Sequence, residues 1–257
     1  MIIQLLAAAA EDVAPENKFG FMEAMEQGGP VAWFILAVMI IMSVGSFYIL
    51  ITKLLEQRKI MKQYENQVAG KFWATGGLQE GAAKLEKNSA WRQLVDDALK
   101  ANEDHGKMTD SREAHDYLHG TLQSSEDSIN AKLATGLPFL ASVGATAPFI
   151  GLLGTVIGIY RALINIGIAG SASIDKVAGP VGEALIMTAI GLFVAVPAVL
   201  AFSWLQSRNR RIAEVMNGFA TDLRAYMGSN GAVKPAVKAA AKPAAKPAAK
   251  PAAATPR

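Results

Sequence analysis

The chain has 257 residues, of which 51% are apolar, and its formal net charge is +3. It contains no cysteine, which excludes disulfides, thiol nucleophiles and cysteine-ligated metal sites. The end of the chain beyond Gly228 holds six positive charges and no acid, so the rest carries a net −3, and the basic character does not predict nucleic-acid binding.

Residues 1–30 form a flank before the first long apolar run. Met1–Ala10 (MIIQLLAAAA) resembles the apolar region of a signal peptide, but the positive charges that usually precede one are missing. A cleaved signal and an uncleaved flank therefore both stay open. Residues 19–27 (FGFMEAMEQ) form a short amphipathic stretch, and Gly28-Gly29-Pro30 then breaks the chain, with Pro30 placed to begin a helix.

Three apolar runs without charge follow, at residues 31–51, 133–160 and 184–207, with lengths of 21, 28 and 24 residues. A helix rises about 1.5 Å per residue, and roughly 20 apolar residues cross a hydrocarbon core of about 30 Å. All three runs are long enough to do so. The sequence therefore predicts an all-α integral membrane protein with three transmembrane helices.

The distribution of charge predicts the orientation in the membrane. The flank before the first run is acidic, whereas the segment behind it carries four basic residues (Lys53, Arg58, Lys59 and Lys62) against one acid. Positive residues gather on the cytoplasmic side of a membrane. We therefore expect the N-terminus outside and the C-terminus in the cytoplasm, in agreement with the three arginines at 208–211 behind the third run.

The 81 residues from 52 to 132 predict cytoplasmic helices. Ser89 is placed to cap one helix, and Thr109 or Asp110 to cap the next. The second of these helices meets no breaker before Gly136, so we predict one long helix that continues into the second apolar run. The apolar faces expected for the two helices are Trp91, Leu94, Val95, Ala98 and Leu99, and Leu118, Leu122, Ser125, Ile129 and Leu133.

The last part of the chain predicts a helix and a tail. Residues 208–227 have an amphipathic pattern whose apolar face is Ile212, Val215, Met216, Phe219, Leu223 and Tyr226. The Lys/Pro/Ala repeats beyond it predict a disordered, extended tail. This cationic tail either contacts the anionic headgroups of membrane lipids or serves as a solubilising segment.

These features divide the chain into eight segments. In chain order, the predicted segments are an outer flank at 1–30, a transmembrane helix at 31–51, a cytoplasmic helical region at 52–132, a transmembrane helix at 133–160, an outer link at 161–182, a transmembrane helix at 183–207, a cytoplasmic helix at 208–227 and a disordered tail at 228–257.

The second run contains a stripe of small residues at helical spacing: Gly144, Ala147, Gly151, Gly154 and Gly158. Small residues let transmembrane helices approach closely, so this stripe predicts a helix-packing contact. Thr155 lies in the same stretch, and Thr188 lies in the third run. The common role of a threonine in a membrane helix is a hydroxyl bonded to a carbonyl of its own helix.

Glu183 stands at the start of an apolar run that carries no other charge as far as Ser207. Ionisable groups in a membrane are costly and often functional. If Pro180 lies in the first turn of the third helix, the carboxylate stabilises the positive end of that helix. If the helix begins near Asp175, Glu183 lies about two turns inside and is a candidate proton-exchanging group. Both interpretations stay open.

No catalytic arrangement stands out elsewhere. His115 and His119 have the i, i+4 spacing of a helical metal chelate but no third ligand of clear spacing, so we expect a solvated face and no metal site. The glycines of residues 151–158 lie in an apolar run, which argues against a phosphate-binding loop. We therefore expect neither an enzyme nor a cofactor.

Two long motifs resemble those of the MotA/TolQ/ExbB proton-channel family. They are APFIGLLGTVIGI at 147–159, and GEAL at 182–185 followed by TAIGLFVAVPA at 188–198. The order of spans, the large first cytoplasmic region and EQGGP at 26–30 also agree, and the ExbB branch is the most similar. The resemblance covers most of residues 19–226.

The resemblance implies a function and partners. Members of this branch form a homo-oligomeric, five-fold ring in the bacterial inner membrane around helices of an ExbD-like single-span protein. A TonB-like protein then drives outer-membrane uptake of iron chelates and vitamin B12. By the same resemblance, Glu183, Thr155 and Thr188 are the pore residues of the proton pathway, and a membrane aspartate comes from the ExbD-like partner.

Two other functions compete with this one. A TolQ-like subunit of the Tol-Pal envelope-integrity system has the same core, and the spacing of the motifs separates the two poorly. A non-conducting membrane scaffold held together by the small-residue stripe is the alternative from another class. Three strong spans argue against a flagellar stator subunit, which normally has four.

Overall fold

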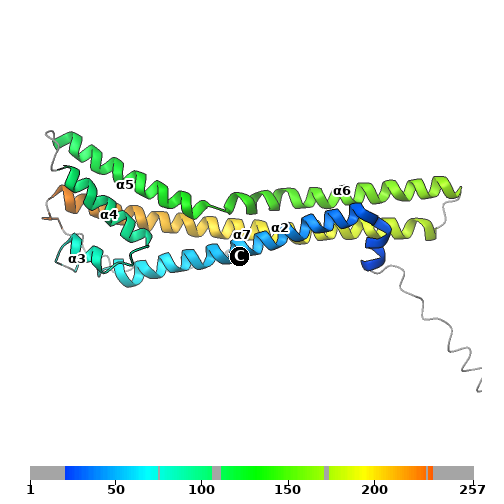
Figure 1. Cartoon of the computed structure of the whole chain (residues 1–257), viewed down its shortest axis with the longest axis horizontal. Helices are drawn as coiled ribbons and strands as arrows, with labels where there is room; N and C mark the ends of the chain where they lie inside the picture. Colours follow the sequence, from blue (N-terminus) through cyan, green and yellow to red (C-terminus); the bar gives the residue numbers. More distant parts are fainter. Residues whose placement is uncertain (1–20, 75, 106–110, 171–173, 230, 234–257) are drawn as a thin grey trace, which may run out of the picture. The chain divides into compact units, whose positions relative to one another are not determined.

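A computed structural model describes residues 21–74, 76–105, 111–170, 174–229 and 231–233 (Figure 1). The signal-like segment at 1–10, the expected caps Thr109 and Asp110 and most of the Lys/Pro/Ala tail lie outside these residues. The described chain is helical: α2 (Phe21–Gln63), the π-helix η1 (Tyr64–Val68), α3 (Leu78–Ala83), α4 (Ala90–His105), α5 (Ser111–Ala134), α6 (Leu137–Ala169) and α7 (Ile174–Gly228).

The chain divides into two compact units. The first, here called the spanning unit, comprises residues up to 55 and residues 134–208, and the second, the bundle unit, comprises residues 56–133 and those from 209 onward. Among the described residues, three helical stretches are long and apolar enough to cross a membrane: Gly28–Val68, His115–Ile168 and Val177–Gly228. The prediction of an all-α protein with three candidate spans is therefore confirmed.

In the spanning unit, α2, α6 and α7 lie side by side (Figure 1). Their shared core consists of Met25, Ala32, Ile35 and Met39 from α2, Val143 and Ala147 from α6, and Met187, Val194, Ala195 and Ala198 from α7. Large apolar side chains cover the outside, among them Phe34, Phe149 and Phe193, which are 69%, 69% and 78% exposed. An outer surface of this kind is typical of a helix that faces lipid or another subunit.

Two glycines with left-handed backbone interrupt the long helices. Gly29 has φ 60° and ψ −156° and kinks α2 directly before Pro30, because a residue before proline disfavours the helical conformation. Gly136 has φ 86° and separates α5 from α6. The predicted continuous helix from the cytoplasm into the second run is therefore wrong at this point, since Gly136 ends α5 and Pro138 is placed to begin α6.

The bundle unit has its own core, and the predicted helix faces are confirmed there. Trp91, Leu94, Val95 and Ala98 of α4 are fully buried, and Ser89 Oγ accepts a hydrogen bond of 3.0 Å from the amide of Arg92 at the start of that helix. The faces of α5 and of the last part of α7 are buried in the same cluster. Trp91 Nε1 also donates a hydrogen bond of 3.0 Å to the carbonyl of Ile60.

The core of the bundle unit contains a buried ion pair. Glu126 of α5 and Arg224 of α7 approach to 2.7 Å, and their side chains are only 4% and 17% exposed. Asn217 donates a second hydrogen bond, of 3.2 Å, to the same carboxylate. A buried carboxylate needs such partners, so this pair fixes how α5 packs against α7 within the unit.

Candidate functional site

The small residues of α6 bring its backbone against that of α7. A Cβ atom on Gly151 would lie 2.8 Å from the carbonyl oxygen of Met187, and one on Gly154 would lie 2.7 Å from the Cβ of Met187. Gly158 is equally close to α7, where an added Cβ would meet Ala184 and the carbonyl of Pro180 at 3.0 Å. All members of the stripe at 144, 147, 151, 154 and 158 are buried.

These contacts set α6 and α7 antiparallel and in register. Gly158 lies level with Ala184, and Gly151 lies level with Thr188. Thr155 is therefore at a height between Glu183 and Thr188. Since a helix rises about 1.5 Å per residue, the three predicted site residues fall within roughly 8 Å along the helix axes. The sequence motifs are thus brought to one level of the spanning unit.

Glu183 lies well inside its helix. α7 begins at Ile174, and Pro180 lies within the helix rather than in its first turn. Glu183 lies nine positions after the first residue of α7, which is about two and a half turns. The carboxylate therefore does not cap the N-terminus of α7, and of the two interpretations left by the sequence, the early start of the helix is the one observed.

The side chain of Glu183 packs against α2. It is only 5% exposed, and a methyl group on Gly28 would overlap with its Oε1 and Cδ atoms. Gly28 thus leaves the space that the carboxylate fills, immediately before the kink at Gly29. The GGP motif therefore does more than break the helix, because its first glycine, Gly28, packs directly against the carboxylate of Glu183.

Arg161 of α6 completes this arrangement. Its Nη1 donates a hydrogen bond to the carbonyl of Gly28, and its charge acts on the carboxylate of Glu183. Thus α2 supplies the glycine, α6 the basic side chain and α7 the acidic side chain. Sequence reasoning missed Gly28 and Arg161 as site residues, although a charged residue directly after a run of 28 uncharged ones was a signal that could have found Arg161.

The site leaves polar atoms unsatisfied. Glu183 Oε2 and Thr188 Oγ1 are buried, and neither has a hydrogen-bond partner among the described residues. A buried polar atom without a partner costs free energy, so native proteins rarely retain one without a functional reason or a bound water. Two such atoms lie on α7, only five residues apart.

Thr155 differs from Thr188. Its hydroxyl is half-buried and donates a hydrogen bond of 2.6 Å to the carbonyl of Leu152 in its own helix. This is the local bond that a threonine in a membrane helix usually forms. The acceptor capacity of the oxygen remains available toward a neighbour. The structure thus brings the three predicted residues to one level. Among the described residues, no hydrogen bond joins their side chains to one another.

The two exposed histidines, His115 and His119, belong to the other unit. His115 and His119 lie on the outer face of α5 in the bundle unit. Within the residues that the structure describes, no group of three or more metal-binding side chains gathers. The chemistry that the spanning unit supports is therefore that of a buried acid, a nearby guanidinium and two hydroxyls.

The sequence profile of the MotA/TolQ/ExbB proton channel family matches residues 88–218. The chain is 40% identical over 238 residues to the biopolymer transport protein ExbB of Xanthomonas campestris pv. campestris, which covers 89% of this chain and 94% of that protein. It is 36% identical over 206 residues to the protein of the same name from Neisseria meningitidis, covering 77% and 92%. Identity to the Tol-Pal system protein TolQ of Pseudomonas aeruginosa is 42% over 96 residues, or 37% and 42% of the two chains. The chain therefore belongs to the MotA/TolQ/ExbB proton channel family.

Proposed function

We propose that this chain is a proton-channel subunit of the bacterial inner membrane, with its N-terminus in the periplasm and its C-terminus in the cytoplasm. It assembles with copies of itself and with an ExbD-like single-span protein. Together they couple the proton motive force, through a TonB-like protein, to uptake across the outer membrane of iron chelates and vitamin B12. The observation that carries this proposal is a carboxylate buried among three spanning helices.

A buried carboxyl group can take up and release a proton without a large change in the fold. Glu183 Oε2 and Thr188 Oγ1 have no hydrogen-bond partner among the described residues, so both have capacity for a water molecule or for a polar group of a partner helix. Thr155 lies between them in height and retains an acceptor oxygen. These three groups are the proton pathway that we propose.

Arg161 is a positioning residue in this proposal. Through the carbonyl of Gly28 it ties α6 to the kink of α2, and its positive charge offsets that of an ionised Glu183. Protonation of Glu183 removes that balance. The charge state of the acid is thereby coupled to the contact between α6 and the N-terminal part of α2.

The extent of the matches favours the ExbB-type role over the TolQ-type role. Relatives named ExbB match 89% and 77% of the chain, whereas the TolQ proteins of Pseudomonas aeruginosa and Haemophilus influenzae match 37% and 62%. The TolQ-like role in envelope integrity therefore remains the second candidate. A non-conducting scaffold has less support, because scaffolding does not explain a buried acid with one carboxylate oxygen that has no hydrogen-bond partner among the described residues.

Complementation separates these functions. The chain would be expressed with the ExbD-like and TonB-like proteins of its own genome in two strains, one without its ExbB-type and one without its TolQ-type protein. We expect growth on an iron chelate to be restored in the first strain and detergent resistance not to be restored in the second. The opposite result would assign the TolQ-like role, and failure of a folded, membrane-inserted chain in both would leave the scaffold.

A further inference from the structure

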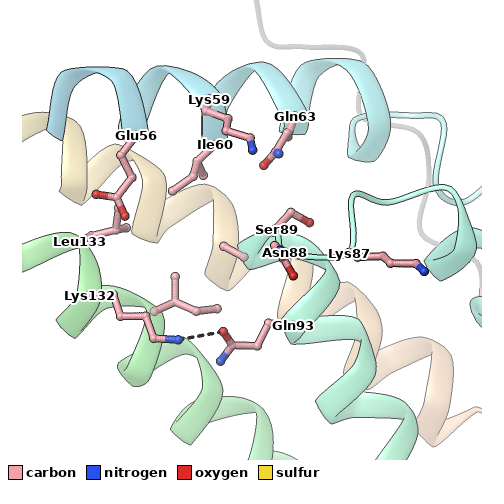
Figure 2. A pocket seen from close by; sticks show the side chains of 12 residues that line it. Glu56, Lys59, Ile60, Gln63, Lys87, Asn88, Ser89, Gln93, Lys132 and Leu133 are labelled. Atoms are coloured by element: carbon pink, nitrogen blue, oxygen red, sulfur yellow. Dashed lines mark hydrogen bonds between the residues drawn. The ribbon is translucent and has the colours of Figure 1, made fainter. Parts of the chain in front are cut away.

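A second candidate site belongs to the bundle unit. It is a cavity of about 370 Å³ between α2, α4, α5 and the loop before α4 (Figure 2). Its volume is in the range of small-molecule pockets and many times that of one water molecule. The wall is formed by Glu56, Lys59, Ile60, Gln63, Lys87, Asn88, Ser89, Ala90, Gln93, Ile129, Lys132 and Leu133.

Polar side chains make up most of this wall. It carries three lysines against one carboxylate, together with the amides of Gln63, Asn88 and Gln93 and the hydroxyl of Ser89. In Figure 2 the side chains of Lys59 and Lys132 come from helices on opposite sides of the cavity, whereas Lys87 is directed away from the other labelled groups. Two cations that flank a space lined by amides and a hydroxyl match an anion with several acceptor oxygens.

Both lysines already have partners in the described structure. Lys59 forms an ion pair of 3.1 Å with Glu86, but the two side chains are 64% and 47% exposed. Exposed pairs of this kind contribute little to stability. Lys132 Nζ donates a hydrogen bond of 3.2 Å to the neutral Gln93. An anion in the cavity would therefore compete with Glu86 for Lys59 and would offer Lys132 a further, charged acceptor.

The start of α4 adds to the positive potential. Ser89 and Ala90 line the cavity, and α4 begins at Ala90. The N-terminus of a helix of 16 residues carries the positive end of its dipole, which favours anions. The cavity thus combines two flanking lysines with a helix N-terminus, and only Glu56 opposes them in the wall.

The sequence positions of the wall residues suggest where such an anion comes from. Lys132 directly precedes the second apolar run, and Glu56 lies five residues beyond the end of the first. At about 1.5 Å per residue, both lie within roughly 8 Å of the end of an apolar run. Phosphate headgroups of lipids occupy that depth, and the cytoplasmic leaflet is anionic.

We propose that this cavity binds a phosphate-bearing anion held by Lys59 and Lys132. The same chemistry fits the headgroup of an anionic phospholipid and a small free phosphate ester. This site is independent of Glu183 and of the proposed proton channel, since all of its residues belong to the bundle unit.

Two binding measurements on the purified full-length chain test the proposal and distinguish the sources. In the first, native mass spectrometry counts phosphatidylglycerol retained from mixed phosphatidylglycerol and phosphatidylcholine nanodiscs. In the second, calorimetry measures binding of glycerol phosphate in detergent. The variants are Lys59→Gln with Lys132→Gln, and Lys62→Gln as a matched control, because Lys62 is an exposed lysine of α2 outside the cavity wall.

We expect the double variant to bind at least tenfold more weakly and Lys62→Gln to bind like the wild type. Loss of retained phosphatidylglycerol identifies a lipid headgroup, and loss of glycerol phosphate binding identifies a free ester; either supports the site. Glu56→Gln should strengthen the same binding, because it removes the opposing charge. Absence of binding in both measurements, or equal binding by wild type and double variant, would overturn the proposal.

Discussion

Substitution of Gly28 by alanine tests the packing around Glu183. The added methyl group would overlap with Oε1 and Cδ of Glu183 and with the Cβ of Ala32. Overpacking a well-filled interior usually costs about 1–3 kcal/mol. In an open helical position the same change would instead stabilise the protein by roughly 0.5–1 kcal/mol. The sign of the effect therefore reports whether the carboxylate is packed against Gly28.

Gly182→Ala is the matched control on α7, because an added Cβ there meets no atom within 4 Å. We expect Gly28→Ala to lower the melting temperature of the detergent-solubilised protein by roughly 2–12 °C, at about 2–4 °C per kcal/mol for a chain of this size. Gly182→Ala should leave it unchanged or raise it. A Gly28→Ala protein as stable as the control would refute the packing of Glu183 against α2.

Two further substitutions, one in each unit, test contacts within that unit. Gly151→Ala should destabilise the chain by about 1–3 kcal/mol, because its methyl group would lie 2.8 Å from the carbonyl oxygen of Met187. Gly167→Ala on the same helix should not destabilise it, since a Cβ atom there meets nothing within 4 Å. Thermal unfolding of both variants gives the comparison. Glu126→Ala should cost about 3–5 kcal/mol in denaturant unfolding, because it leaves the largely buried Arg224 without its carboxylate. A loss no larger than that of Asp96→Ala, whose pair with Arg92 is more exposed, would contradict this.

Much of the fold followed from helical periodicity and run length. The faces of α4 and α5 and the three candidate spans were readable because each depends on residues that are near one another in sequence. The break at Gly136 was not predicted, although Gly136 was recognised as the first possible breaker, because apolar periodicity does not show whether a glycine ends a helix. Short elements such as α3 and the π-helix η1 have no periodic pattern long enough to be recognised.

The sequence predicted only part of the site. Glu183 and the small-residue stripe drew attention because a charge and a series of glycines are unusual in apolar runs. The surroundings of Glu183 depend on contacts between distant segments, such as that between Arg161 and Gly28, which are 133 residues apart. The depth of Glu183 in α7 likewise depended on where the helix begins, and the sequence alone allowed two answers.

Proton flux through reconstituted vesicles tests the central claim most directly. The chain and its ExbD-like partner would be placed in liposomes with a pH gradient and an internal pH dye, and Glu183→Gln would be compared with Glu214→Gln, an exposed acid of α7 in the bundle unit. The proposed role predicts that Glu183→Gln abolishes the flux while the oligomer still assembles, and that Glu214→Gln conducts like the wild type. Undiminished flux through an assembled Glu183→Gln complex would contradict the role of this buried acid.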